Sequence, residues 1–420
     1  MAPRVNLAVS VQRVSPAQWR VLALLTLSVW INYVDRANLS VAAPQLRSEL
    51  SLTAADLGIL LSAFFWTYAA FQPAAGWVVD RFSASWALAI GYLLWSGATA
   101  ATGVVTTLQS LLVFRLVLGA GESIAYPAYS KILANYFPQQ RLALANALID
   151  AGSKLGPAAG TLVGGLLVAR LGWRIFFIAL GLISLAWLVP WAVWAPRASS
   201  RLTPAAPAGA GPGFGDVLRV RAIWGTFLGH FGGNYLLYFL LTWLPSYLVT
   251  ERKFSMDEMA VLGSLPYVVI AVSAVSAGWL SDRLIQRGAS VTKVRIAFAA
   301  GGLAGATVIV LVPLIPGHLP ALAVLWVACL SYGMFSSNLW AITQTLSGPE
   351  AAGKWSGLQN CFGNLAGVVA PALTGIVVSR TGRFSLAFVA VACVLATGAG
   401  AYVFIVRRVE PVRWVGGASS

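Results

Sequence analysis

Charged residues are scarce in this sequence. Only 10% of the 420 residues are Asp, Glu, Lys or Arg, whereas 58% are hydrophobic. Soluble chains usually carry about a quarter charged residues, so this chain has too few to cover a globule in water. The scarcity excludes a soluble globular protein and predicts that lipid surrounds most of the surface.

Cysteine and the motifs of common enzymes are also rare or missing. The three cysteines, Cys329, Cys361 and Cys393, lie in apolar stretches without ligand spacing, which argues against disulfide, zinc and iron–sulfur chemistry. The sequence has no G-x-S-x-G, H-E-x-x-H or G-x-x-x-x-G-K-[ST] motif. We therefore expect neither an enzyme nor a bound cofactor, and the missing P-loop leaves an ion gradient as the source of energy.

Long apolar runs make up most of the chain. A membrane-spanning helix needs about 20 predominantly apolar residues. Such runs predict an all-α integral membrane protein with twelve spans, near residues 19–42, 56–79, 85–107, 109–136, 143–169, 173–195, 220–249, 257–285, 293–315, 319–347, 354–379 and 383–406.

The net charge of +15 is distributed unevenly over the predicted loops. When loops are assigned alternately to two sides, the side with both termini carries 17 Lys and Arg, the other side 7 and the spans 4, which accounts for all 28. An excess on one side is the positive-inside pattern and predicts cytoplasmic termini. Topology, together with attraction to anionic lipid, thus explains the basic balance, and we expect no nucleic-acid partner.

A segment rich in Pro, Ala and Gly separates the sixth and seventh predicted spans. It cannot cross a bilayer and predicts a cytoplasmic linker. We therefore predict an N-terminal six-helix half at residues 1–195, a linker at 196–219 and a C-terminal six-helix half at 220–420.

The two halves repeat each other at an offset of 202 residues. Identical pairs coincide at this offset: Asn32-Tyr33 with Asn234-Tyr235, Gly76-Trp77 with Gly278-Trp279, and Asp80-Arg81 with Asp282-Arg283. Matches of these residue types are much less expected by chance than matches of Leu or Ala. Duplicated halves around a midplane site are typical of alternating-access transporters, so the repeat predicts two pseudo-symmetric halves and a transport function.

The Asp-Arg pairs resemble the loop motif of the major facilitator superfamily, G-x-x-x-D-R/K followed by glycine and basic residues. The second copy, GWLSDRLIQRG, is fuller, whereas residues 83–85 of the first copy are Ser, Ala and Ser. The resemblance implies a conformational charge network at the cytoplasmic gate, made by Asp80, Arg81, Asp282 and Arg283.

Ionisable residues at bilayer depth usually mark a pathway or a coupling site. In this chain they all lie in the N-terminal half, and they are Asp35, Arg36, Arg115, Glu122, Lys131, Asp150 and Lys154. At the repeat offset, the C-terminal half has Leu237 and Tyr238 in place of Asp35 and Arg36. We therefore expect the chemistry to be concentrated in one half.

The spacing of these residues leaves several pairings open. Arg115 and Glu122 are two helical turns apart and share a face, so they could form a structural ion pair. Asp150 and Lys154, spaced i, i+4, could neutralise each other, or Lys154 could contact a substrate. Asp35 is deep enough for desolvation to favour its protonated form, while a nearby cation would restore its charge, as a proton symporter requires.

Four segments resemble the anion:cation symporter branch of this superfamily: INYVDRANLSVAAPQL, FRLVLGAGESIAYPA, YFLLTWLPSYL and LQNCFGNLAGVVAP. Its members include carriers of galactonate, glucarate, hexuronates, tartrate and phthalate, and the vesicular glutamate and sialic acid transporters. The resemblance implies that Asp35 and Glu122 couple transport to protons. It implies that Arg36 and Arg115 organise the site and attract the anion.

The same resemblance implies further substrate contacts at Tyr33, Tyr68 and Asn360, and we expect Trp340 in the wall of the C-terminal half. Ser153 stands where galactonate carriers have glutamine, and Lys154 follows it. A second cation there would favour a dicarboxylate such as tartrate or glucarate, an expectation that weakens if Asp150 pairs with Lys154.

The sequence thus predicts proton-coupled uptake of a small organic anion such as a sugar acid, uronate or dicarboxylate. The alternative is a proton-coupled exporter of drugs or metabolites, since exporters carry the same loop motif. We expect a multi-pass protein of a bacterial inner membrane that works as a monomer, with protons as the coupling ion and no other cofactor.

Overall fold

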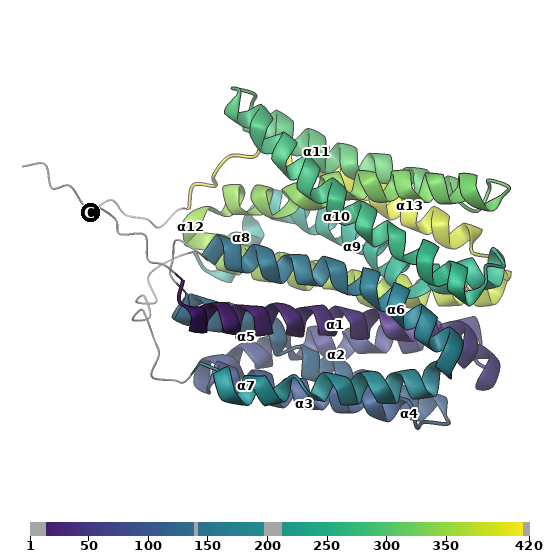
Figure 1. The fold of residues 1–420 in the computed structure, drawn as a ribbon. Helices are drawn as coiled ribbons and strands as arrows, with labels where there is room; N and C mark the ends of the chain where they lie inside the picture. Colours follow the sequence, from purple (N-terminus) through teal and green to yellow (C-terminus); the bar gives the residue numbers. More distant parts are fainter. Residues whose placement is uncertain (1–13, 138–141, 197–211, 415–420) are drawn as a thin grey trace, which may run out of the picture.

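A computed structural model describes residues 14–137, 142–196 and 212–414, apart from the side chains of a few residues within these ranges, Asp80 among them. These residues fold into a bundle of long helices (Figure 1). The α-helices are α1 (Pro16–Glu49), α2 (Ala54–Arg81), α3 (Ala84–Thr102), α4 (Leu108–Glu122), α5 (Ala125–Tyr136), α6 (Leu142–Leu185), α7 (Leu188–Trp194), α8 (Phe214–Arg219), α9 (Arg221–Ser246), α10 (Met256–Gln286), α11 (Val291–Ala306), α12 (His318–Thr381) and α13 (Ser385–Gly400). Short π or 3₁₀ segments extend three spans: η2 (Tyr247–Glu251), η3 (Thr307–Leu311) and η4 (Ala401–Val406).

The helices account for twelve spans, as predicted. The fourth span consists of α4 and α5, and the seventh, ninth and twelfth end in η2, η3 and η4. The continuous helices α6 and α12 each contain two spans, which meet at Gly172 (φ 76°) and Gly348 (φ 60°). Glycine adopts this left-handed backbone at little cost, so each of these residues turns the chain between spans. Eight segments of the described chain are long and apolar enough to cross a bilayer on length and composition alone, and one of them, Leu148–Trp194, covers two spans.

The repeat has a structural basis at the helix starts. Thr53 and Asp56 form a capping box at the start of α2, and Ser255 and Glu258 form one at the start of α10. In each box the hydroxyl accepts from a backbone N–H of the first turn, and the carboxylate accepts from the N–H of the capping residue. The offset of 202 residues therefore aligns two helices that begin by the same device.

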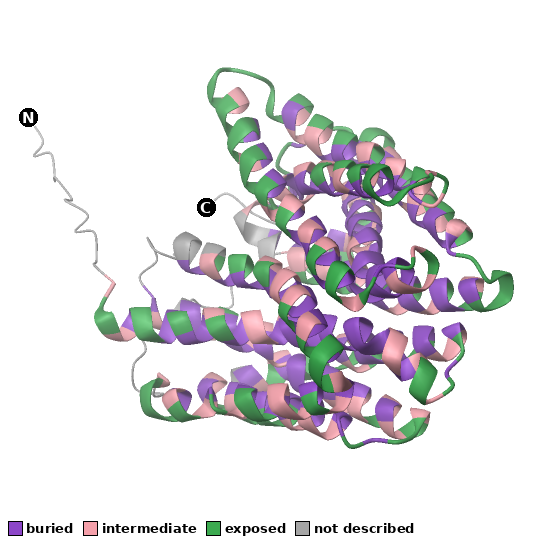
Figure 2. Cartoon of the chain, turned by 45° about the vertical axis from the view of Figure 1, so that its right-hand side comes forward, coloured by how far each residue is buried: buried purple, intermediate pink, exposed green. Residues whose placement is uncertain are grey.

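The outer faces of the bundle are apolar. Trp86, Ile183 and Val275 are 71%, 71% and 76% exposed, and exposed residues cover the outside of the helices while buried ones line the contacts between them (Figure 2). Helices with exposed apolar faces are stable where lipid replaces water, which agrees with the composition.

Close packing of α6 on α1 positions the first span. A Cβ atom added at Gly156 would lie 2.5 Å from Cβ of Tyr33, and one at Gly160 would lie 3.1 Å from Cβ of Ala37. Small residues at four-residue spacing let two membrane helices approach to backbone contact. This packing holds α1, which carries Asp35 and Arg36, against the fifth span.

Contacts between the first six and last six spans concentrate at one end of the bundle. We call the end where α1 begins and α7 ends the linker side, and the opposite end the far side; in Figure 1 the linker side is at the left. On the far side, a Cβ atom at Gly58 would lie 2.9 Å from Cα of Gly375, and Ser62 Oγ donates to the carbonyl of Val368 at 3.0 Å. A Cβ atom at Gly165 would lie 2.5 Å from Cβ of Ala260.

On the linker side, glycines of the same two helices have no close neighbour. A Cβ atom at Gly76 of α2 or at Gly357 of α12 would meet nothing within 4 Å. The described chain is therefore closed at the far side and more open toward the linker side. Residues 197–211 of the predicted linker lie outside the described residues, and the boundaries at 195 and 220 remain predictions.

Candidate functional site

A buried ion pair joins the first and fourth spans. Nε of Arg36 donates to Oε2 of Glu122 at 2.9 Å, and the two side chains are 2% and 0% exposed. Glu122 is the last residue of α4, at the point where the fourth span breaks before α5 begins at Ala125. Burying two charges is costly unless they pair, so this contact fixes α1 against α4.

Three aromatic rings surround the guanidinium of Arg36. Its Cζ atom lies 4.5 Å from the ring centre of Tyr68, 4.6 Å from Tyr33 and 5.0 Å from Phe64. Arginine stacks favourably on aromatic faces, and the rings shield its charge from lipid. The structure thus brings together Tyr33, Arg36, Tyr68 and Glu122 from the predicted site.

Arg115 and Asp35 lie beside this pair. Cζ of Arg115 is 5.3 Å from the ring centre of Phe64, so this one ring lies next to both arginines. Oδ1 of Asp35 accepts from Nδ2 of Asn38 at 3.4 Å, and Asp35 interacts electrostatically with Arg115. The sequence left a pairing of Arg115 with Glu122 open; in the structure the partner of Glu122 is Arg36 instead.

Several polar atoms of this cluster are buried without a hydrogen-bond partner among the described residues. They are Nη2 of Arg36, Nε of Arg115, Oδ2 of Asp35, Oε1 of Glu122 and both side-chain polar atoms of Asn32. Buried polar groups in native proteins almost always have a partner, which can be water or a ligand. So many unpaired donors and acceptors in one place are typical of a binding site.

Neutral side chains of the last six spans lie across from these charges. The hydroxyl of Tyr238 donates to Oδ1 of Asn364 at 2.6 Å, and Nδ2 of Asn364 donates to the carbonyl of Asn360 at 2.9 Å. The ring centres of Tyr238 and Phe65 are 4.5 Å apart, which links the two sets of spans. Asn364 was not among the predicted site residues, although it lies one helical turn after Asn360 in the segment LQNCFGNLAGVVAP.

Asp150 and Lys154 form an ion pair on α6, with side chains 62% and 32% exposed. Ser153 is 9% exposed, and its hydroxyl donates to the carbonyl of Asp150 at 2.7 Å. Asp150 also interacts electrostatically with Tyr33 and with Tyr332 of α12. Because Asp150 pairs with Lys154, the prediction of a free second cation at Lys154 weakens.

Trp340 lies farther along the opposite wall. It is 38% exposed, and its ring packs edge-on against His230 with 5.3 Å between centres. His230 is 4% exposed, and its Nδ1 lies 3.2 Å from the carbonyl of Gln359. No ion pair or hydrogen bond in the described chain joins Trp340 to Arg36 or Glu122.

The predicted gate residues lie at the linker-side ends of α2 and α10. Arg81 lies 6.0 Å from the ring of Trp77, and Arg283 lies 4.9 Å from the ring of Trp279, so the repeat extends to these stacks. The side chain of Asp80 lies outside the described residues.

The other acidic gate residue, Asp282, has a partner that the sequence analysis missed. Its Oδ1 accepts from Arg295 of α11 at 2.8 Å, and Arg295 also donates to Ser281 and to Asn338. The spacing of the motif gives no signal for this partner, because Arg295 belongs to the next span.

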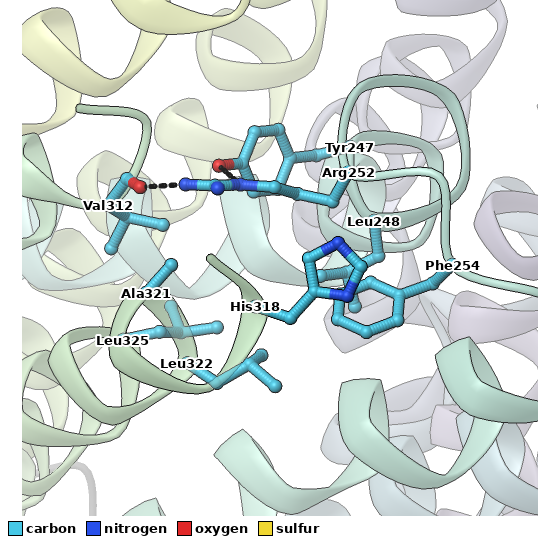
Figure 3. Close-up of a pocket in the computed structure, with 9 residues that line it drawn as sticks. All are labelled: Tyr247, Leu248, Arg252, Phe254, Val312, His318, Ala321, Leu322 and Leu325. Carbon is cyan, nitrogen blue, oxygen red and sulfur yellow. Dashed lines mark hydrogen bonds between the residues drawn. The ribbon is translucent and has the colours of Figure 1, made fainter. Parts of the chain in front are cut away.

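A small pocket on the far side is too small to be the main site. Its volume is about 10 Å³, which is room for one water molecule. Arg252 lines it and donates to the hydroxyl of Tyr247 at 2.6 Å and to the carbonyl of Val312, and His318 packs on Phe254 (Figure 3). Arg252 also donates to the carbonyl of Ile315. In the described part of the chain, no group of three or more His, Cys, Asp or Glu residues could hold a metal ion.

Comparison with known proteins identifies the family. Residues 25–371 match the model of the Major Facilitator Superfamily. The chain is 33% identical over 404 residues to a probable sulfoacetate transporter of Cupriavidus necator, covering 92% of this chain and 93% of the relative. It is 30% identical over 409 residues to the hexuronate transporter of Bacillus subtilis, with 93% and 94% covered.

A solved structure of a bacterial homologue of the lysosomal transporter Spinster has the same fold. It superposes with a TM-score of 0.81 at 18% identity and covers 94% of this chain and 98% of the solved one. The family model, the relatives and the twelve spans agree on one assignment. The chain is a multi-pass membrane transporter, not an enzyme, and belongs to the Major Facilitator Superfamily.

Proposed function

We propose that this protein takes up a small organic anion together with protons by alternating access. Candidate substrates are sugar acids, uronates and dicarboxylates. The printed names of its relatives support small organic anions as a class: sulfoacetate, hexuronate and, for a probable transporter of Escherichia coli, L-galactonate. The observation that carries the proposal is the buried pair of Arg36 and Glu122 beside Arg115 and Asp35. Intramembrane charges of this kind are retained where they bind or couple ions.

In the proposed transport cycle, Glu122 and the substrate anion compete for Arg36. While Glu122 is ionised it occupies the guanidinium, and no anion can use the same donors. A proton on Glu122 removes its charge, so Arg36 becomes available to the carboxylate of the substrate. Asp35 acts in the same way toward Arg115. The bound anion then offsets the positive charge that protonation leaves on the arginines, so the loaded site crosses the closed states of the transporter at lower cost than the protonated, empty site.

Alternating access requires the two sides to close in turn. Glycine contacts such as that of Gly58 with Gly375 close the far side, whereas Gly76 and Gly357 have room around them. In this proposal residues 1–195 and 220–420 are the moving halves. Arg81, Asp282 and Arg283, together with Asp80, hold the linker-side gate when it closes.

Substrate contacts in this proposal come from both walls. Tyr33, Arg36, Tyr68 and Arg115 bind the charged end of the anion. The remaining contacts are Ser153, Lys154, Trp340 and Asn360. We further propose that the protein works as a monomer in a bacterial inner membrane with cytoplasmic termini, so that the linker side faces the cytoplasm and protons are the coupling ion.

The test is proton uptake into proteoliposomes that contain purified protein and an internal pH dye. Sugar acids, uronates, tartrate and phthalate are added in turn, with neutral sugars and lipophilic cations for comparison. We expect acidification with one class of acid, and its loss in Asp35→Asn because that variant cannot exchange a proton. Asp257→Asn, an exposed carboxylate at the start of α10, is the matched control and retains the signal. A response to cations alone would replace the proposal by proton-coupled export.

A further inference from the structure

The ion pair of Asp150 and Lys154 stands on the face of α6 that meets the last six spans. Residues 150, 154, 161 and 165 share one helix face by their spacing. On the far side this face is in contact with α10: a Cβ atom at Gly165 would lie 2.5 Å from Cβ of Ala260, and one at Gly263 would lie 3.5 Å from the methyl group of Thr161. Toward the linker side the same face is exposed at Asp150 and half-buried at Lys154. The pair therefore borders the opening between the two sets of spans.

The pair is also the next charged group outward from Arg36. Asp150 interacts electrostatically with Tyr33, whose ring lies 4.6 Å from the guanidinium of Arg36. It interacts in the same way with Tyr332 on the opposite wall. Tyr33 is therefore shared between the surroundings of Arg36 and those of the Asp150–Lys154 pair.

The charges around this region balance. Arg36 pairs with Glu122, Lys154 pairs with Asp150, and Arg115 lies in the field of Asp35. The interiors of the last six spans contain no Asp, Glu, Lys or Arg, so the opposite wall contributes no charge. Lys154 is therefore the remaining cation that could meet a second negative charge on a ligand, and Asp150 occupies it.

We propose that Asp150 sets the charge class of the substrate by neutralising Lys154, so that the site takes a monoanion whose far end is uncharged. The inference rests on the proposed function and narrows it. With Lys154 neutralised, the second carboxylate of a dianion would lose its hydration without gaining a free cation, which disfavours its binding. An uncharged end can instead accept hydrogen bonds from the hydroxyl and amide groups of the opposite wall.

Two six-carbon acids separate the possibilities, because glucuronate has one carboxylate and glucarate has two. Their dissociation constants are measured by isothermal titration calorimetry on the purified full chain at neutral pH. We expect wild type to bind glucuronate about tenfold or more tighter than glucarate. In Asp150→Asn the ratio shrinks by about tenfold, because Lys154 becomes free to bind the second carboxylate; tenfold corresponds to about 1.4 kcal/mol.

The double variant Asp150→Asn with Lys154→Gln is the matched control. Whatever its effect on the two dissociation constants, it restores their wild-type ratio, because no free cation remains at this place. Asp150→Ser provides a second route to a free Lys154 if the Asn variant does not fold. Binding of both acids with a ratio that Asp150→Asn leaves unchanged overturns the inference but not the proposed function. A wild type that prefers glucarate has the same consequence. Binding of neither acid, nor of any acid in the transport panel, overturns the proposed function and the inference with it.

Discussion

The first six spans and the last six have the same architecture and different chemistry. Both sets use a capping box at the start of their second helix and stack an arginine on a tryptophan at its end. Arg36 of the first set is paired with Glu122, whereas its counterpart Tyr238 donates to an amide. The two sets thus share features of helix capping and helix ends, whereas the ionisable residues at bilayer depth lie in the first set. In the proposed function the charged set binds the anion and couples it to protons, and the neutral set shapes the remainder of the site.

Among the variants that test this difference, Glu122→Gln is expected to have the largest effect. The amide keeps the shape of the side chain but cannot gain and lose a proton, so we expect proton-driven accumulation of the anion to be abolished. Exchange of substrate across the membrane needs no net proton movement and should continue. Both are measured in proteoliposomes, with accumulation driven by a pH gradient and exchange by preloaded substrate.

The matched control for this variant comes from the neutral set. Glu258 accepts from the backbone N–H of Ser255 at 2.8 Å, and glutamine can make the same cap. We therefore expect Glu258→Gln to retain both accumulation and exchange. Accumulation that persists in Glu122→Gln would show that proton coupling does not depend on this carboxylate.

The sequence was sufficient to predict the twelve spans and the repeat. In lipid every backbone polar group must be satisfied within a helix, so long apolar runs determine the secondary structure almost alone. The structure gives a physical reason for the repeat at an offset of 202, because Thr53 and Ser255 cap equivalent helices. The break in the fourth span directly after Glu122 was not predicted, because its sequence stays apolar and small on both sides.

The partners within the site could not be read from the sequence. Arg36 and Glu122 are 86 positions apart, and their contact depends on how α1 packs against α4. Helical spacing relates residues only within one span, which is why it offered Arg115 as a partner of Glu122. Phe64 carries no charge and stood out in no pattern, yet its ring lies beside both arginines.

A second test concerns the closed far side, where each set contributes a glycine to the contact. Substitutions in the two sets should therefore have similar effects. A Cβ atom at Gly58 would lie 2.7 Å from the carbonyl oxygen of Pro371, and one at Gly375 would lie 2.5 Å from that of Ala54. We expect Gly58→Ala and Gly375→Ala each to destabilise this closed state by about 1–3 kcal/mol, since overpacking forces the helices apart. The melting temperature of the purified protein measures the effect.

Two glycines on the linker side control for the change of residue. Gly76→Ala and Gly357→Ala introduce the same methyl group where nothing lies within 4 Å, so they should leave the melting temperature unchanged or raise it slightly. Equal losses in all four variants would mean that the alanine itself, and not far-side closure, is responsible.

The smallest expected effect is that of Tyr238→Phe on the neutral wall. Removal of the hydroxyl leaves Oδ1 of Asn364 without its donor at 2.6 Å. We expect the binding free energy of the anion to become less favourable by about 1 kcal/mol, which corresponds to about fivefold weaker binding. Proton coupling should be unaffected, because no charge has changed. Tyr235→Phe, one turn earlier on α9, is the control, since its hydroxyl has no partner among the described residues. If Tyr238→Phe instead abolished proton-driven accumulation while sparing exchange, the coupling machinery would extend into the last six spans, and the division of labour between the two sets would be wrong.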